Sequence, residues 1–104
     1  MGFPRPKPER LAEKLRQIRL TLGISQQVMH KRLGVEDLIA YNEISKYELG
    51  KNEPYLQILL QYARVAGIHT EALIDDALNL PDKLPGDVRH EEIKRKYTPR
   101  GKKR

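Results

Sequence analysis

Four glycines divide the middle of this 104-residue chain into helix-sized segments. They are Gly23, Gly34, Gly50 and Gly67. Glycine readily takes the left-handed backbone conformation in which many helices end. Three of the four are followed by an apolar residue, which often accompanies this kind of helix ending: Ile24, Val35 and Ile68. The pattern predicts a series of short helices, each closed by a glycine.

The apolar residues between these glycines recur mainly three or four positions apart, which places them on one face of a helix. The stripes are Leu11, Leu15, Ile18 and Leu22; Val28, Met29 and Leu33; Leu56, Leu59, Leu60 and Ala63; and Leu73, Ile74 and Leu78. Ser25 and Thr70 are suited to N-cap positions, and Pro54 to a first helical position. We therefore expect five helices, at about 9–22, 25–33, 40–48, 54–66 and 70–78, and no strand.

These helices predict one all-α domain over residues 9–78. The segments on either side are rich in proline, so we expect an N-terminal arm over 1–8 and an extended or flexible basic tail over 79–104. The chain has no cysteine, which excludes disulfides, Cys-ligated zinc and thiol catalysis. No apolar run approaches the roughly 20 residues that cross a bilayer, and the N-terminus lacks an apolar signal region. We expect a cytoplasmic protein without membrane contact.

Positive charge is segregated along the chain, whose net charge is +6. Residues 1–52 hold ten Lys and Arg against six Asp and Glu, whereas residues 53–92 hold three against eight. Residues 93–104 hold seven basic residues and no acidic one. Such segregation suits a polyanionic partner, because neutralised phosphates release condensed counterions. A basic tail that is merely solvated explains the last segment equally well.

The second and third predicted helices carry the functional signal. In the helix at 40–48 only Ile44, Tyr47 and, just past its end, Leu49 are candidates for the core. The remaining side chains reach outward: Tyr41, Asn42, Glu43, Ser45 and Lys46. A helix of this kind fits the major groove of DNA, where amides pair with adenine and lysine with guanine. The preceding helix, beginning at Ser25 and Gln26, would offer backbone N–H groups to phosphates.

In order and spacing, these residues resemble the phage-repressor, Cro-like (xenobiotic-response-element) helix-turn-helix family over residues 10–76. The resemblance is carried by Leu15, Arg19, Leu22-Gly23-Ile24-Ser25-Gln26, Leu33-Gly34-Val35, Ile44-Ser45-Lys46-Tyr47-Glu48, Gly50-Lys51 and Pro54, and then by Leu59-Leu60, Tyr62-Ala63, Ala66-Gly67-Ile68 and Leu73-Ile74. It implies a compact five-helix lambda-repressor-like domain with extended tails. It also implies a sequence-specific, repressor-like transcription regulator of prokaryotic or phage type that binds double-stranded DNA as a homodimer.

The resemblance further implies a role for each matching position. Gln26 would brace both the DNA backbone and the recognition helix, and Ser25 and Lys51 would contact phosphates. Arg19 and Glu48 would form a structural ion pair between the first and third helices. The residues toward the base edges would be Tyr41, Asn42 and Lys46, with Glu43 a weaker candidate and Ser45 on the same outward face.

Two features depart from the family pattern. Eight residues separate Val35 from Ile44, more than the tight turn usual in the family. The insert 36–39 therefore either lengthens the connection or extends the recognition helix at its start. His30 stands where the family usually has a small alanine, so its ring must shift the helix or point toward the surface.

Nothing in the sequence indicates an enzyme. The acidic pairs Asp75-Asp76 and Glu91-Glu92 are adjacent in sequence, so they lack the facing geometry of acid–base catalysis. The three histidines lie far apart, and we expect no metal and no cofactor. Two alternatives stay open. One is an antitoxin that autoregulates through this domain and binds a protein partner through its C-terminal tail; the other is a protein-interaction module that reads no bases.

Overall fold

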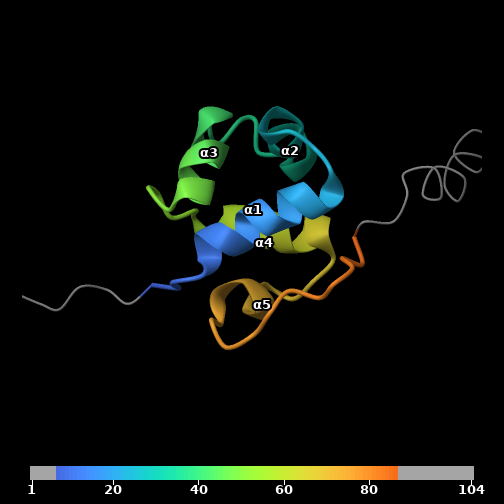
Figure 1. The fold of residues 1–104 in the computed structure, drawn as a ribbon. Coiled ribbons are helices and arrows are strands. Elements are labelled where there is room, and N and C mark those ends of the chain that lie inside the picture. Colours follow the sequence, from blue (N-terminus) through green and yellow to red (C-terminus); the bar gives the residue numbers. More distant parts are fainter. Residues whose placement is uncertain (1–6, 87–104) are drawn as a thin grey trace, which may run out of the picture.

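The computed structural model describes residues 7–86, which form helices joined by turns and irregular segments (Figure 1). The helices are α1 (Leu11–Leu22), α2 (Gln26–Leu33), α3 (Asn42–Leu49), α4 (Leu56–Ala66) and α5 (Thr70–Ile74). The predicted all-α class is confirmed. Residues 1–6 and 87–104 lie outside the described residues, and with them most of the predicted arm and tail. No helix within residues 7–86 has the length and apolar character to cross a membrane.

The helix ends follow the glycines. Gly23, Gly34, Gly50 and Gly67 have φ values of 71°, 70°, 77° and 74°, which is the left-handed region. At the end of α4 the amide of Gly67 donates to the carbonyl of Ala63 at 2.8 Å, and the amide of Ile68 donates to the same carbonyl at 3.0 Å. These bonds satisfy a carbonyl that the end of the helix would otherwise leave unpaired.

The helix starts agree less well with the prediction. Ser25 is the N-cap of α2, and its Oγ accepts a hydrogen bond from the amide of Val28 at 3.1 Å. Thr70 is not an N-cap: His69 takes that position, and Thr70 is the first residue of α5. Pro54 is not in α4 either, because the helix begins two residues later at Leu56 and Pro54 is buried before it.

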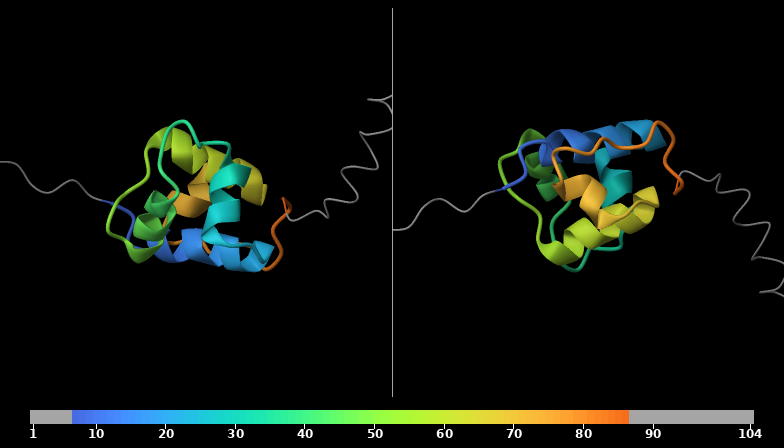
Figure 2. Two further views of the ribbon diagram at one scale, coloured as in Figure 1. Left: turned by 90° about the horizontal axis from the view of Figure 1, so that it is seen from above. Right: turned by 90° about the horizontal axis from the view of Figure 1, so that it is seen from below.

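The five helices surround one core. In Figure 1, α1 and α4 cross the middle of the molecule, α2 and α3 lie on one side of them and α5 lies on the other, and Figure 2 gives two further views. The α3 helix packs against both α1 and α2. Every helix contributes at least one fully buried side chain, and burying each large apolar one contributes about 1.5–3 kcal/mol. These side chains include Leu15, Ile18, Met29, Ile44, Ile58, Tyr62 and Leu73.

The buried face of α4 differs from the predicted one. Leu59 and Ala63 are buried as expected, but Leu56 is 81% exposed and Leu60 also lies on the outside. Ile58 and Tyr62 take their place in the core. Both sets follow helical spacing, and the contacts of α4 with α2 and α5 select the second one. Three other residues of the predicted stripes are also exposed: Val28, Ile74 and Leu78.

The folded part of the chain continues past residue 78, where the domain was expected to end. The segment after α5 is irregular, yet Leu80 and Leu84 are buried in the core. Beyond them the amide of Gly86 donates to the carbonyl of Ala66 at 2.8 Å. A Cβ atom at Gly86 would collide with the backbone around Val65, so this close approach requires glycine.

The start of α1 is capped by a residue from the far end of the domain. The carboxylate of Asp76 accepts hydrogen bonds from the backbone amides of Glu9 at 2.9 Å and Arg10 at 3.0 Å. These bonds hold the pKa of Asp76 below its ordinary value. In return the guanidinium of Arg10 donates to the carbonyl of Asp76 at 2.8 Å and to the side-chain oxygen of Asn79 at 2.9 Å.

Lys14 makes a second link between the same elements. Its side chain is buried, and its Nζ donates to the carbonyls of Ala72 at 2.8 Å and Asp75 at 2.9 Å. Burial lowers the pKa of Lys14, because the charged form loses solvation. Positive charge at the end of α5 is favoured by the helix dipole. Asp76, Arg10 and Lys14 together join α1 to the residues at and after the end of α5.

Candidate nucleic-acid interface

The α3 helix has one buried face and one open face. Ile44, Tyr47 and Glu48 are buried against the rest of the domain. The opposite face carries exposed side chains at positions four and three residues apart: Asn42, Lys46 and Leu49. Ser45 lies beside them and is half-buried. An exposed helix face with an amide and a lysine presents the chemistry that reads base edges in a major groove.

Tyr41 immediately precedes α3 and is 53% exposed. Its backbone already has helical angles, and its carbonyl accepts the amide of Ile44 at 3.1 Å. The carbonyl of Ala40 accepts the amide of Glu43 at 3.0 Å. The insert at 36–39 therefore lengthens the connection between α2 and α3, and α3 is not extended through it. Tyr41 and Asn42 together form the outward-facing start of the helix.

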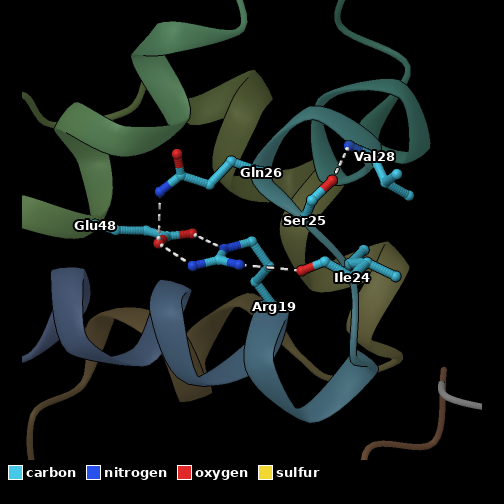
Figure 3. A network of polar contacts seen from close by, with 6 residues as sticks. All are labelled: Arg19, Ile24, Ser25, Gln26, Val28 and Glu48. Carbon is cyan, nitrogen blue, oxygen red and sulfur yellow. Dashed lines mark hydrogen bonds and ion pairs between the residues drawn. The ribbon is translucent and has the colours of Figure 1, made fainter.

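The orientation of α3 is set by a polar network around Glu48, shown in Figure 3. Arg19, from α1, donates to Glu48 from Nε at 2.7 Å and from Nη2 at 3.0 Å. Its Nη1 donates to the carbonyl of Ile24 at 3.0 Å. The Nε2 of Gln26, from α2, donates to Glu48 at 3.2 Å. Glu48 thus joins three helices, and its hydrogen bonds raise the pKa of Arg19.

The start of α2 lies close to this network. Gln26 is the first residue of α2, so its backbone amide has no acceptor within the helix. Ser25 is exposed at the N-cap, and its Oγ accepts the amide of Val28. The N-terminus of α2 is therefore joined to the buried face of α3 through the Gln26 side chain.

Glu43 lies on the flank of α3, toward the connection to α4. One carboxylate oxygen accepts a hydrogen bond from Nδ2 of Asn52 at 3.0 Å, and the other lies 3.5 Å from Nζ of Lys46. Lys51 is exposed in the connection, and its amide closes α3 by donating to the carbonyl of Lys46 at 2.9 Å. Lys46 therefore places a positive charge in the second half of α3, and Lys51 places another just past the end of the helix.

The structure places two residues of this region differently from the sequence prediction. Leu49 was a candidate for the core, but it is 65% exposed and lies on the open face of α3. Its position three residues after Lys46 and seven after Asn42 is the signal that could have placed it there. His30 is the other. Its ring is buried, and Nε2 lies 2.7 Å from the carbonyl of Ile39. The ring points to the inserted segment and not to the surface.

The expected interface residues are thus placed around two helices. Ser25 and Gln26 lie at the start of α2, Tyr41 and Asn42 at the start of α3, and Lys46 on the open face of α3. Arg19 and Glu48, expected to pair, form an ion pair beneath that face. Glu43 is held sideways by Asn52, so it points less directly outward than Asn42 does.

Two helices joined by a turn, with the second presenting a polar open face, define a helix-turn-helix domain. A family model described as "Helix-turn-helix" matches residues 15–73. Among curated proteins, the chain is similar to the SPbeta prophage-derived uncharacterized HTH-type transcriptional regulator YonR of Bacillus subtilis (strain 168). The two are 35% identical over 81 residues, which cover 69% of this chain and 71% of YonR. No solved structure gives a significant match.

This chain belongs to the XRE-type helix-turn-helix family of DNA-binding transcription regulators. The matched range includes every residue of α2 and α3 and most of α1 and α5, so it contains the whole candidate interface from Ser25 to Lys51.

Proposed function

We propose that the protein is a sequence-specific, repressor-like transcription regulator that binds double-stranded DNA with the open face of α3 in the major groove. The observation that carries the proposal is the exposure of Asn42 and Lys46 on a helix whose opposite face is fixed by Glu48. In this mode, Asn42 pairs with a base edge and Lys46 with a guanine edge or a nearby phosphate. Ser25, Gln26 and Lys51 contact the flanking phosphates.

We further propose that two copies bind one palindromic operator. A dimer places its two α3 helices about one DNA turn apart, near 34 Å, and reads the same half-site twice. The exposed apolar side chains of Ile74 and Leu78, which follow Gly67, support an apolar contact between copies. Titration of the full palindrome and of a single half-site tests this, because a monomeric reader would bind the two with the same affinity for each half-site, whereas a dimer would bind the palindrome much more tightly.

The central experiment is selection of a preferred sequence from random DNA, followed by titration of that sequence and of random DNA at two salt concentrations. We expect the preferred sequence to bind at least about a thousandfold more tightly. Asn42→Ala should cost about 1–3 kcal/mol, concentrated at one base pair. Lys51→Ala should weaken binding to all sequences alike and reduce the salt slope by about 1.

Gln57→Ala is the matched control, since it removes an exposed amide from α4, outside the candidate interface from Ser25 to Lys51. It should leave both affinities unchanged. Equal affinity of the wild type for selected and random DNA would contradict the proposal. A DNA affinity that neither Asn42→Ala nor Lys46→Ala changes would favour the protein-interaction module instead.

A further inference from the structure

Ile39 anchors the inserted connection between α2 and α3 in two ways. Its side chain is half-buried and packs against the core. Its backbone carbonyl lies 2.7 Å from Nε2 of His30, which is within hydrogen-bonding distance. A carbonyl oxygen can only accept, so Nε2 carries the proton and donates it. The His30 ring is itself buried in α2, so the donor is held in place by its surroundings.

The anchored carbonyl lies immediately before the first turn of α3. The next two carbonyls along the chain, those of Ala40 and Tyr41, accept the amides of Glu43 and Ile44 at 3.0 and 3.1 Å. The peptide that His30 holds therefore leads directly into the helix. A rotation of that peptide would displace Ala40 and then Tyr41 and Asn42, which are the first candidate base-reading residues along the chain.

The other side of the connection is open. Leu38, Ala40 and Tyr41 are exposed. A hollow of about 460 Å³ separates the connection from the loop between α3 and α4, where Asn52 and Tyr55 lie. Side chains of that loop therefore do not fill the space beside the connection. His30 contacts the connection from the opposite side.

We propose that His30 is a positioning residue for base recognition: its hydrogen bond to Ile39 fixes the start of α3, and so the side chains of Tyr41 and Asn42 in the groove. The inference rests on the proposed function, since it assigns His30 a role in the same interface. Amide–base hydrogen bonds weaken steeply with misalignment, so a displacement of about 1 Å removes much of their discrimination. Lys46 lies one turn later, in the half of α3 that the bonds from Arg19 to Glu48 fix, and therefore depends less on His30.

Two substitutions separate the hydrogen bond from the packing of the ring. His30→Phe keeps a ring of similar size but has no donor, whereas His30→Gln keeps an N–H donor at the corresponding reach. The control is His69→Ala, which removes a histidine that is exposed before α5. Circular dichroism at the binding temperature checks that each variant retains the helical content of the wild type.

The readout is base preference at single positions of the selected sequence. The base pair at which Asn42→Ala loses its preference is the first site, which the start of α3 reads. The base pair at which Lys46→Ala loses its preference is the second site, which the second half of α3 reads. We expect His30→Phe to reduce the preference at the first site by about tenfold, the size of one lost bidentate contact. His30→Gln should stay within about threefold of the wild type there. In both variants, preference at the second site and affinity for random DNA should change by less than about twofold.

Two results would overturn the inference: wild-type preference in His30→Phe, or an equal loss at every position and on random DNA. The second result would mean that His30 only stabilises the fold. The wild type alone tests the proposed function, because a wild type that prefers no sequence defeats that function before any His30 variant is made. A wild type with a clear preference, together with an unaffected His30→Phe, defeats only the role of His30.

Discussion

At the centre of the core the side chain of Tyr62 is fully buried, and within residues 7–86 its hydroxyl is the buried side-chain polar group that has no hydrogen-bond partner. Burial raises the pKa of Tyr62, because the phenolate would be still harder to accommodate than the phenol. A buried polar group without a partner costs about 1–3 kcal/mol relative to its hydrated state.

Tyr62→Phe should therefore stabilise the protein, by about 1 kcal/mol. The substitution removes only the oxygen and leaves the packed ring in place. The free energy of unfolding from urea titration measures the effect. Tyr55→Phe, at an exposed tyrosine, is the control and should be neutral. A loss of stability in Tyr62→Phe would show that the hydroxyl has a partner, such as a buried water molecule.

Between elements, the ion pair of Arg19 and Glu48 joins α1 to α3. The two side chains are 14% and 3% exposed, so water screens the pair only slightly. Glu48→Gln leaves Arg19 without its counter-charge in a part-buried position, and we expect a loss of about 3 kcal/mol in the free energy of unfolding. Arg19→Lys should also destabilise, because lysine keeps the charge but loses the two-pronged geometry.

Glu43→Gln is the control for this prediction on the same helix. Glu43 pairs with Lys46 at 3.5 Å near the surface, where ion pairs contribute only about 0–1 kcal/mol. In chemical denaturation, Glu48→Gln should therefore lower the free energy of unfolding much more than Glu43→Gln does. Equal effects of Glu48→Gln and Glu43→Gln would contradict the assignment of Glu48 as the residue that holds α3.

At this scale the sequence predicted the helix ends much better than the buried faces. A glycine after a helical stripe is a local signal, since it depends on the backbone of that residue alone, and the predicted endings at Gly23, Gly34, Gly50 and Gly67 are correct. The α5 helix, which no glycine follows, ends at Ile74 and not at residue 78 as predicted. Which face of α4 is buried does not follow from a local signal. Leu56, Ile58, Leu60 and Tyr62 form two overlapping stripes, and only the packing of α4 on its neighbours decides between them.

The candidate interface was predictable where residue type and spacing suffice, and less so in the connection. The outward position of Asn42 and Lys46 follows from the buried positions of Ile44 and Tyr47 on the same helix. The bond from His30 to Ile39 joins residues on either side of an insert, whose path no periodicity describes. The same holds for Leu80 and Leu84, which are isolated leucines in a proline-containing segment.

Over the whole molecule, Asp76 joins the segment after α5 to the residues at the start of α1. Hydrogen bonds from the amides of Glu9 and Arg10 hold the pKa of Asp76 below its ordinary value of 3.8. A carboxyl whose pKa is lower in the folded state stabilises the fold at pH values above the unfolded-state pKa. That stabilisation is lost as the pH falls through the folded-state pKa.

The difference in the free energy of unfolding between the wild type and Asp76→Asn should be constant from about pH 8 to pH 5. It should shrink below about pH 4, as Asp76 becomes protonated in the wild type. Asp82→Asn, at an exposed aspartate, should show no such change. A difference between wild type and Asp76→Asn that does not depend on pH would mean that the negative charge of Asp76 does not hold the cap.

The hydrogen bonds between Asp76 and the start of α1 also bear on when the domain can fold during its synthesis. The ribosome releases α1 early, but the carboxylate that binds the amides of the two residues before it is more than sixty residues away and emerges later. A helix of 12 residues is marginal in water by itself, so α1 in a nascent chain gains little from forming early. The domain is therefore expected to fold as one cooperative unit only after the segment that carries Asp76 has emerged from the ribosome. Chains truncated before Asp76 should be readily degraded by cellular proteases.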